Sequence, residues 1–449
     1  MSLLDDVSIV VTPNGYKAGE LYAVIPSNGD ADMDVTRATA ATRVDENGLV
    51  NYAEVVSDTE LVTNGDFSTD SDWGKFDGTT ISGGAINFNV TNTGTKANQT
   101  NVMTSGLLYK VTFEISNYVG GNIYMSGWSI PLAERTEQSN GVFSFYAEAS
   151  GSTFTIGTTS SSTQLSIDSI SVKEIQRDNV PRIDYTGGGC PHILAEPQRT
   201  NIVFPSAVAV TQTRTVSATE YTLSFYGTGS VVLSGTHSAT LNGTSVNNRV
   251  TLSFTPTAGS LTLTISGTVT NIQLEVGSYA TSLIPTSGGT VTRNQDIFTR
   301  DGIGSLINST EGTIFVEMAA LANDSTNRYI SINDGSSTNR IIFKFGTSSN
   351  NISALGLGTA TSFSLSYSSA TITNMNKIAL KYKVNDCALW VNGVEVATDT
   401  TFTAYTANTL NQINFSNYAS SGQFLDAKVK QLQVYKTALT DTQLAALTS

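Results

Sequence analysis

Cys190 and His192 form the one place in the sequence where a thiol and an imidazole lie close together along the chain. A thiolate beside an imidazole can act as a nucleophile with its general base. The intervening Pro191 and the lack of a surrounding catalytic signature favour a structural role for both residues. Because His237 is the only other histidine, a metal site with two histidine ligands would have to join two separate domains.

Other catalytic patterns give no clearer indication of an enzyme. The sequence contains no glycine-rich phosphate loop and no Gly-x-Ser-x-Gly elbow. A carboxylate pair for glycoside hydrolysis is defined by its separation in space, so the sequence leaves that chemistry open. We expect a protein that is not an enzyme and that needs no cofactor. Calcium stays possible without an assigned site, because four acids lie beside turns where they could act as ligands or only as caps: Asp66, Asp168, Asp324 and Asp334.

Aromatic residues suggest a different chemistry, the binding of sugars. Sugar sites in β-sandwiches stack a ring on an exposed aromatic side chain and add hydrogen bonds from amides or carboxylates. For Trp390, in the alternating run "CALWVNGV", packing in a core is the favoured interpretation, because one face of such a strand is normally buried. Core packing is also the alternative for the five residues that we identify as candidates: Trp73, Tyr124, Trp128, Tyr329 and Tyr367.

The composition indicates an all-β protein with several domains. A chain of 449 residues is too long for one ordinary core, and charged residues make up only 14% of it. The formal net charge of −13 disfavours binding to nucleic acid or to anionic lipid. Asp5 and Asp6 stand where a secretory signal would be basic, and no apolar run reaches the roughly 18 residues of a membrane span, so we expect no membrane insertion.

Short alternating runs bounded by Gly, Asn and Ser predict tandem β-sandwiches joined by irregular segments. Asn392-Gly393 predicts a two-residue hairpin, and Thr440 is placed to cap a short C-terminal helix. The expected organisation begins with an extended N-terminal anchoring segment (1–60) and a first sandwich (61–175). A joint (176–205), a small sandwich (206–300) and a final sandwich (301–449) follow.

Two of these regions carry a prediction about independent folding. Residues 1–60 show few alternating strands, yet their apolar runs "VSIVV" and "LYAVI" could not be buried by a lone segment. We therefore expect partner chains to order this segment, so that residues 58–449 would fold without it. Residues 310–449 hold their own set of strands and are expected to fold as a separate module.

The irregular segments mix Arg, Asp and apolar residues, which predicts that they pack against other structure. Three of them, "TRATAATRVDENGLV", "NVPRIDYTGGGCPHILAEPQRTNIVFPS" and "IQLEVGSYATSLIPTSGGTVTRNQD", resemble in this order segments of tail-fibre and receptor-binding proteins of tailed bacteriophages. We expect charge-assisted contacts to fix the path of the first segment against a neighbouring subunit, the alternative being a solvated turn. The resemblance implies a structural joint formed by Arg37, Arg43, Asp45, Arg182, Asp184, Glu196 and Arg199.

The sandwiches carry resemblances of their own. "LVTNGDFSTDSDW", with the later "IDSISVKEI", resembles carbohydrate-binding jelly rolls. "LWVNGVEV" and "VKQLQVYKTALTDTQLAAL" resemble laminin-G-like or concanavalin-like lectin sandwiches. No metal or sugar site of these families can be matched residue by residue.

Together the resemblances imply a phage virion structural protein, a tail fibre that binds host surface glycans. It would be made in the host cytoplasm, assemble as a homo-oligomer, expected to be a trimer, and lie on the virion surface with its N-terminal segment on other virion proteins. The alternatives are a head fibre or capsid decoration protein without a receptor role, and a glycan-degrading tail enzyme. Phage spikes that degrade polysaccharides usually show long repetitive β-helices, whereas this sequence shows separate sandwiches of short strands. The difference favours a protein that is not an enzyme.

Overall fold

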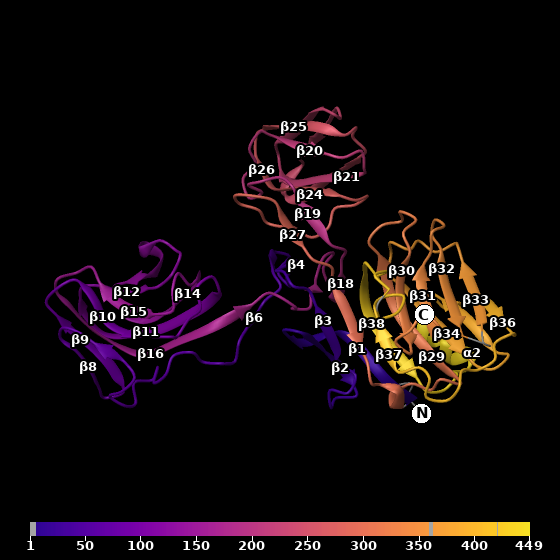
Figure 1. Ribbon diagram of the computed structural model, residues 1–449, viewed down its shortest axis with the longest axis horizontal. Coiled ribbons are helices and arrows are strands. Elements are labelled where there is room, and N and C mark those ends of the chain that lie inside the picture. Colours follow the sequence, from indigo (N-terminus) through magenta and orange to yellow (C-terminus); the bar gives the residue numbers. More distant parts are fainter. Residues whose placement is uncertain (1–5, 359–361, 420) are drawn as a thin grey trace. The chain divides into compact units, whose positions relative to one another are not determined.

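A computed structural model describes residues 6–358, 362–419 and 421–449. The chain divides into two compact units (Figure 1). One unit consists of residues 54–176, and the other is formed by residues 1–53 together with residues 177–449. The start and the end of the chain therefore fold together, and the first predicted sandwich is an insertion between them. No helix within the described ranges is long and apolar enough to cross a membrane.

The unit of residues 54–176 is a sandwich of two antiparallel sheets. Val111, Phe113 and Ile115 alternate along one strand and are buried between the sheets, as the period-two pattern predicts. A short 3-10 helix, η1, covers Leu132–Arg135. One sheet has the order β13 (Thr136–Glu137), β12 (Ile123–Ser126), β15 (Phe154–Thr158), β10 (Gly94–Gln99) and β7 (Gly74–Lys75). The other runs β14 (Gly141–Glu148), β11 (Leu108–Gly120), β16 (Thr163–Gln176), β9 (Ala85–Val90) and β8 (Thr79–Ser82), with β6 (Val55–Val56) paired to β16.

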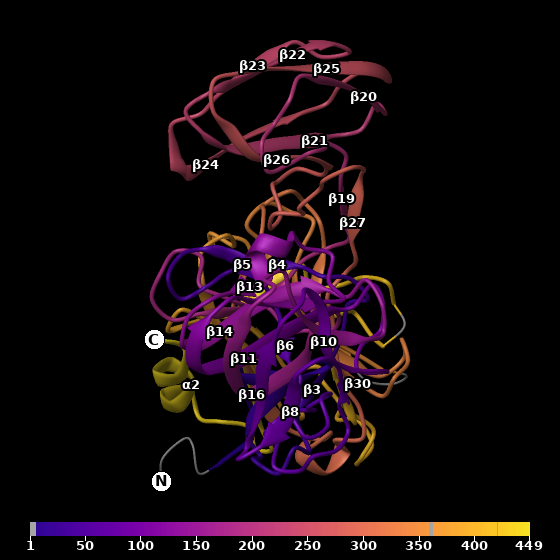
Figure 2. The same ribbon diagram turned by 90° about the vertical axis from the view of Figure 1, so that its left-hand side faces the viewer.

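The small sandwich has a four-stranded and a three-stranded sheet, which Figure 2 shows one above the other. Leu223, Phe225 and Leu263 lie in its core. The four-stranded sheet has the order β20 (Gln212–Val216), β25 (Gly259–Ser266), β22 (Ser230–Gly235) and β23 (Ala239–Asn242). The three-stranded sheet has the order β24 (Ser245–Phe254), β21 (Tyr221–Gly227) and β26 (Val269–Val276). Two short ladders lie outside these sheets: β19 (Arg199–Asn201) with β27 (Val291–Arg293), and β4 (Thr42–Val44) with β5 (Val50–Tyr52).

The C-terminal sandwich is built on one continuous strand order that folds around a single core. A 3-10 helix, η2 (Gly304–Leu306), lies in the chain just before β29 (Gly312–Ala320). The order is β33 (Ser362–Tyr367), β32 (Ile352–Leu357), β31 (Arg340–Phe345), β30 (Arg328–Asn333), β37 (Gln412–Asn414), β28 (Ile297–Arg300), β3 (Met33–Thr36), β2 (Glu20–Ile25), β1 (Val7–Lys17), β38 (Ala427–Tyr435), β29 (Gly312–Ala320), β34 (Asn376–Tyr382), β35 (Cys387–Val391) and β36 (Val394–Asp399). Off this path, β17 (Ile183–Asp184) pairs with β18 (His192–Ala195), which pairs with β38.

The N-terminal strands lie in the middle of this order, which corrects two expectations. Strand β1 lies beside β38 (Figure 1) and pairs with it, with Val10 facing Gln433. Strand β3 pairs with β28. Ile9, Val11 and Leu21, from the runs "VSIVV" and "LYAVI", are fully buried in the core of the C-terminal sandwich. The expectation that partner chains order the N-terminal segment is therefore wrong, because the chain's own C-terminal part does so. For the same reason residues 310–449 are not a complete module.

Two local predictions in this sandwich are confirmed. Asn392 and Gly393 both have positive φ, 50° and 85°, as a two-residue hairpin turn requires. Thr440 caps helix α2 (Asp441–Thr448) in a capping box with Gln443. The helix packs on the outer face of the sheet, in a small apolar cluster that includes the buried Trp390.

Replacing Gly393 is expected to weaken this hairpin. The Gly393→Val variant would force a branched side chain into a left-handed backbone, at a cost on the order of 1 kcal/mol or more. The position also donates its N–H to Thr448 Oγ1 at 3.1 Å, so helix α2 should loosen with the turn. Thermal unfolding should show a lower Tm. Gly288→Val is the control, since no side chain or backbone atom crowds that position and its φ is not left-handed; an equal loss of Tm in both variants would contradict this explanation.

Candidate functional site

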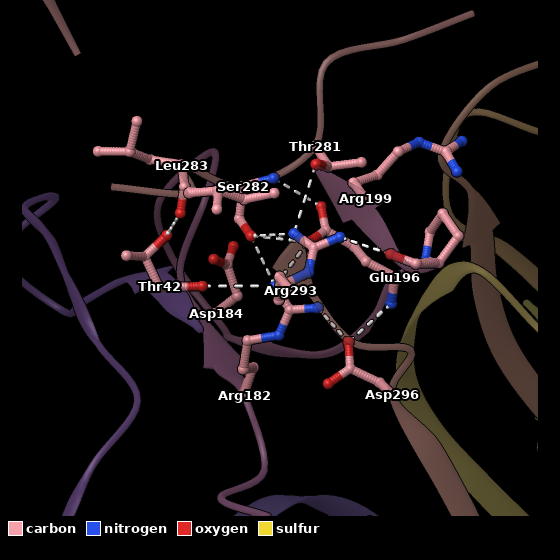
Figure 3. Close-up of polar contacts among 12 residues, drawn as sticks. Thr42, Arg182, Asp184, Glu196, Arg199, Thr281, Ser282, Leu283, Arg293 and Asp296 are labelled. Carbon is pink, nitrogen blue, oxygen red and sulfur yellow. Dashed lines mark hydrogen bonds and ion pairs between the residues drawn. The ribbon is translucent and has the colours of Figure 1, made fainter. Parts of the chain in front are cut away.

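Five charged side chains meet in the interior of the larger unit. Figure 3 labels four of them, Arg182, Glu196, Arg293 and Asp296, and the fifth is Arg37. Arg182 lies between two carboxylates, pairing with Glu196 at 2.6 Å and with Asp296. Arg37 pairs with Asp296 at 2.8 Å, and Arg293 pairs with Glu196 at 2.7 Å. All five residues are at most 4% exposed. We call this set the joint network; it links the segment after β3, the two ends of the β17–β18 ladder and the segment from β27 to β28.

The joint network confirms part of the sequence interpretation and corrects another part. Arg37 does make a charge-assisted contact, but its partner Asp296 belongs to the same chain. Arg43 donates to the carbonyl of Ile183 at 3.2 Å. Asp45 only caps its own β4–β5 turn, where it accepts backbone N–H groups. No neighbouring subunit is needed to explain any of these contacts.

Two members of the joint network were not singled out from the sequence. Arg293 and Asp296 lie in "TVTRNQD", the end of the third segment that resembles phage proteins. Two opposite charges three residues apart in that segment could have indicated that both belong to the joint. Arg199, which was singled out, lies at the margin with its Nε 3.9 Å from Glu275. Asp184 accepts the backbone N–H of Val44 and does not join the network.

The network stays ionised because its charges compensate one another. Burial alone would raise the pKa of Glu196, but the charges of Arg293 and Arg182 outweigh it and hold that pKa well below the usual range. Burial acts in the same direction on Asp296, and Arg182 and Arg37 likewise lower its pKa. For Arg182, the two carboxylates outweigh burial and raise the pKa of the guanidinium.

These lowered pKa values predict a loss of stability in acid. The unfolded carboxyl groups titrate near pH 4, above the folded pKa values of Glu196 and Asp296, so the unfolded state binds more protons in this range. The stabilisation is complete above about pH 4 to 5 and declines as the pH falls below it. Urea unfolding between pH 7 and pH 3 should show this decline, with a shallower slope in Glu196→Gln. A slope unchanged by that substitution would contradict the assignment.

A second feature of the larger unit is a surface hollow of about 360 Å³ at the end of β33. Its wall includes Tyr367, which is half-buried and packs one side against the core. Ser369, Thr371 and Asn374 also line it and are exposed. Within the described part of the chain these three side chains make no hydrogen bond, so their hydroxyl and amide groups are open to a ligand. We call this feature the Tyr367 hollow.

Hydrogen bonds of asparagine side chains hold the backbone around the Tyr367 hollow in place. Asn376 is buried, and its amide donates to the carbonyls of Thr371 at 3.0 Å and Asn374 at 2.7 Å. Asn392, from the hairpin turn, donates to Asn376 Oδ1 at 3.0 Å. The hairpin predicted from "VNGV" therefore also holds one side of the hollow. An aromatic ring beside fixed backbone and free polar groups is an arrangement that can bind a sugar ring.

Three of the five aromatic candidates are corrected by their burial. Trp73 is 6% exposed, packs against Phe154 and donates its Nε1 proton to the carbonyl of Asn64. Trp128 is 4% exposed and meets Phe154 edge to face. Tyr329 is 7% exposed on β30, a strand whose residues are all buried. None of the three offers a free face to a sugar: Trp73 and Trp128 fill the core of their sandwich, and Tyr329 is covered, with Lys344 Nζ 6.0 Å from the centre of its ring.

The remaining candidate, Tyr124, is half-buried on β12. Its ring lies over Gly157, where an added Cβ would come within 2.4 Å of the ring, so it covers its own sheet. A polar hollow of about 270 Å³ exists in the same unit and is lined by Asp72, Asn98 and Gln99 among others, but not by Tyr124. Tyr367 is thus the one candidate that the structure places in a hollow with free polar groups.

The residues considered for catalysis and metal binding lie apart from these features. His192 is buried, with Nε2 3.3 Å from Asp184 Oδ1, and burial lowers its pKa to about 4, so it is neutral at pH 7. Asp324 pairs with Arg328 at 2.8 Å, and Asp334 caps its own turn through Ser336. Among the residues that the structure describes, no three His, Cys, Asp or Glu side chains are grouped so that they could hold a metal ion.

A comparison with protein families decides the class of the C-terminal sandwich. Residues 292–445 match the family described as the concanavalin A-like lectin/glucanases superfamily. The C-terminal sandwich is a lectin-like domain. The match begins within β27, so strands β1 to β3 are contributed to this domain from outside the matched range.

Comparisons with individual proteins give only distant similarities. The CBM40 of the Ruminococcus gnavus IT-sialidase bound to α2,3-sialyllactose is 17% identical, covering 31% of this chain and 83% of that one, with a TM-score of 0.28. Domain 4 of AbnA, a Geobacillus stearothermophilus arabinanase, in complex with arabinotriose, is 13% identical, covering 39% and 84%, with a TM-score of 0.30. The NanB sialidase of Streptococcus pneumoniae is 14% identical, covering 33% and 26%, with a TM-score of 0.29. No curated protein matches the chain.

Proposed function

We propose that this protein binds carbohydrate through the Tyr367 hollow of its lectin-like domain and does so without catalysing a reaction. The observation that supports carbohydrate binding is the match of residues 292–445 to the concanavalin A-like lectin/glucanases superfamily. The hollow adds the chemistry. Tyr367 supplies an apolar ring for the carbon face of a sugar, while Ser369, Thr371 and Asn374 supply donors and acceptors for its hydroxyl groups.

Replacing Tyr367 should separate binding from folding. Tyr367→Ala is expected to weaken binding to a host polysaccharide about five- to tenfold, because an aromatic contact of about 1 kcal/mol or slightly more corresponds to that factor. Affinity electrophoresis in a polysaccharide gel measures the change. Tyr16→Ala is the matched control, since Tyr16 is also half-buried against the same core but does not line the hollow. Both variants should lose a similar amount of Tm, and equal binding by both would contradict the assignment.

We further propose that the protein is a tail fibre of a tailed phage. In that role it is made in the host cytoplasm, assembles as a homotrimer, lies on the virion surface and binds host glycans. The support for this role is the resemblance of three joint segments to phage receptor-binding proteins, and the fact that charged residues of all three meet in the joint network. A weak sugar site suffices in such an assembly, because linked copies raise the effective concentration for each further contact.

Purified chain should compete with phage particles for adsorption to host cells, and antibodies against the chain should label the tail. Labelled capsids with unchanged adsorption would instead indicate the head-fibre or decoration alternative. Release of reducing ends from host polysaccharide would overturn the non-enzymatic part of the proposal.

A further inference from the structure

A separate cavity of about 290 Å³ lies beside the joint network, in the same unit of the chain. The β4–β5 hairpin, the segment after β26 and the ends of β18 and β38 enclose it. It shares no lining residue with the Tyr367 hollow. Its charged lining consists of Arg43, Asp184, Glu196, Arg249 and Lys428.

The three cations of this lining are Arg43, Arg249 and Lys428. Arg249 donates to the carbonyl of Thr281 at 2.6 Å and to Ser224 Oγ at 2.8 Å, and both acceptors are neutral. In the part of the chain that the structure describes, Arg43 donates a hydrogen bond only to the carbonyl of Ile183, and the Nε of each arginine has no acceptor. Asp45, outside the lining, is near enough for its charge to interact with that of Arg43. Within the described residues neither arginine nor Lys428 forms an ion pair. Each of the three side chains is half-buried, so water screens its charge only in part.

The two carboxylates of the lining do not cancel this charge. Glu196 is already paired with Arg182 and Arg293. Asp184 accepts the backbone N–H groups of Val44 and Thr186, each at 2.8 Å, and offsets one of the three cations. The lining therefore keeps an excess of positive charge inside a chain whose net charge is −13. A cavity of this kind favours an anion.

The rest of the wall indicates what kind of anion fits. Tyr226 and Tyr279 line the cavity together with Leu194, Leu283 and Leu321. Such a wall suits a ligand with a carbon ring, and half-buried guanidinium groups suit a planar carboxylate, which they can bind through two parallel hydrogen bonds. We propose that this cavity binds the carboxylate of an acidic sugar, with Arg249 and Arg43 as the residues that recognise the charge.

Calorimetric titration of the full chain with glucuronate, its methyl ester and glucose tests the proposal. The ester keeps the ring and removes the charge. Glucuronate should bind at least tenfold more tightly than either neutral probe. The difference should shrink as salt is raised from 50 to 500 mM, because the Debye length then falls from roughly 14 Å to roughly 4 Å. Equal binding of all three probes, or no binding of glucuronate, would overturn the proposal.

Variants locate the site. Arg249→Gln and Arg43→Gln should each weaken glucuronate binding at least fivefold. Arg214→Gln is the matched control, because Arg214 belongs to the same small sandwich and stacks on Phe204 at 3.6 Å but does not line the cavity. Unchanged binding in both folded cavity variants would also overturn the proposal. Tyr367→Ala should leave glucuronate binding intact, so failure of this site and failure of the Tyr367 hollow are distinguishable.

Discussion

Removing residues 1–36 is expected to unfold the C-terminal lectin-like domain. Strands β1, β2 and β3 contribute five large buried side chains to its core, besides the small Ala23: Ile9, Val11, Leu21, Met33 and Val35. At roughly 1.5 to 3 kcal/mol for each, their loss amounts to about 7 to 15 kcal/mol, which equals the whole stability of a typical domain. The deletion also leaves β38 without its partner β1 and exposes an unpaired strand edge. Near-ultraviolet circular dichroism and solubility should both show the loss.

The control deletes a different part of the chain. Residues 54–176 form their own unit, and the two ends of the remaining chain lie close together, since the Arg177 guanidinium stacks 3.9 Å from the ring of Tyr52. Joining residues 53 and 177 through a short Gly-Ser linker should therefore leave the Tm of the lectin-like domain nearly unchanged. A soluble fragment of residues 37–449 with a cooperative transition at the Tm of the whole chain would contradict the role of the N-terminal strands.

Breaking the joint network should have the second largest effect. Glu196→Gln removes one carboxylate, so that the buried Arg293 loses its ion pair and the buried Arg182 keeps only its pair with Asp296. Removing one partner of a buried pair typically costs about 3 to 5 kcal/mol, because the remaining charge is uncompensated. Urea unfolding at pH 7 measures the loss. Glu20→Gln breaks a pair with Lys17 that is partly exposed to water, and it should change the stability much less, so similar effects of the two substitutions would contradict the importance of burial.

Features governed by local sequence were predictable. The alternating run "YTLSFYG" coincides with β21, and the Asn392-Gly393 turn and the Thr440 cap are both present. Each depends on residues that are neighbours in the chain, so period, turn chemistry and capping are enough to identify it. The all-β class follows from the same short-range signals.

Features governed by distant pairing were not predictable. The run "VSIVV" was recognised as apolar, but its partner β38 lies at the other end of the chain, and alternation does not say which strand a strand will pair with. Aromatic candidates failed for a related reason. Trp128 and Tyr367 both stand in strand-like surroundings, and only the packing of the second sheet decides which ring is buried. Arg37 was visible as a charge, whereas its partner Asp296 is set by the tertiary fold.

Carbohydrate binding is the central claim, and a glycan array of host surface polysaccharides tests it most directly. Purified full-length chain should be applied beside Tyr367→Ala and Tyr16→Ala at equal concentration. We predict that the unaltered chain and Tyr16→Ala bind the same polysaccharides, and that Tyr367→Ala loses the neutral ones. Absence of binding by the folded, unaltered chain across the array, or an unchanged pattern in Tyr367→Ala, would contradict the claim.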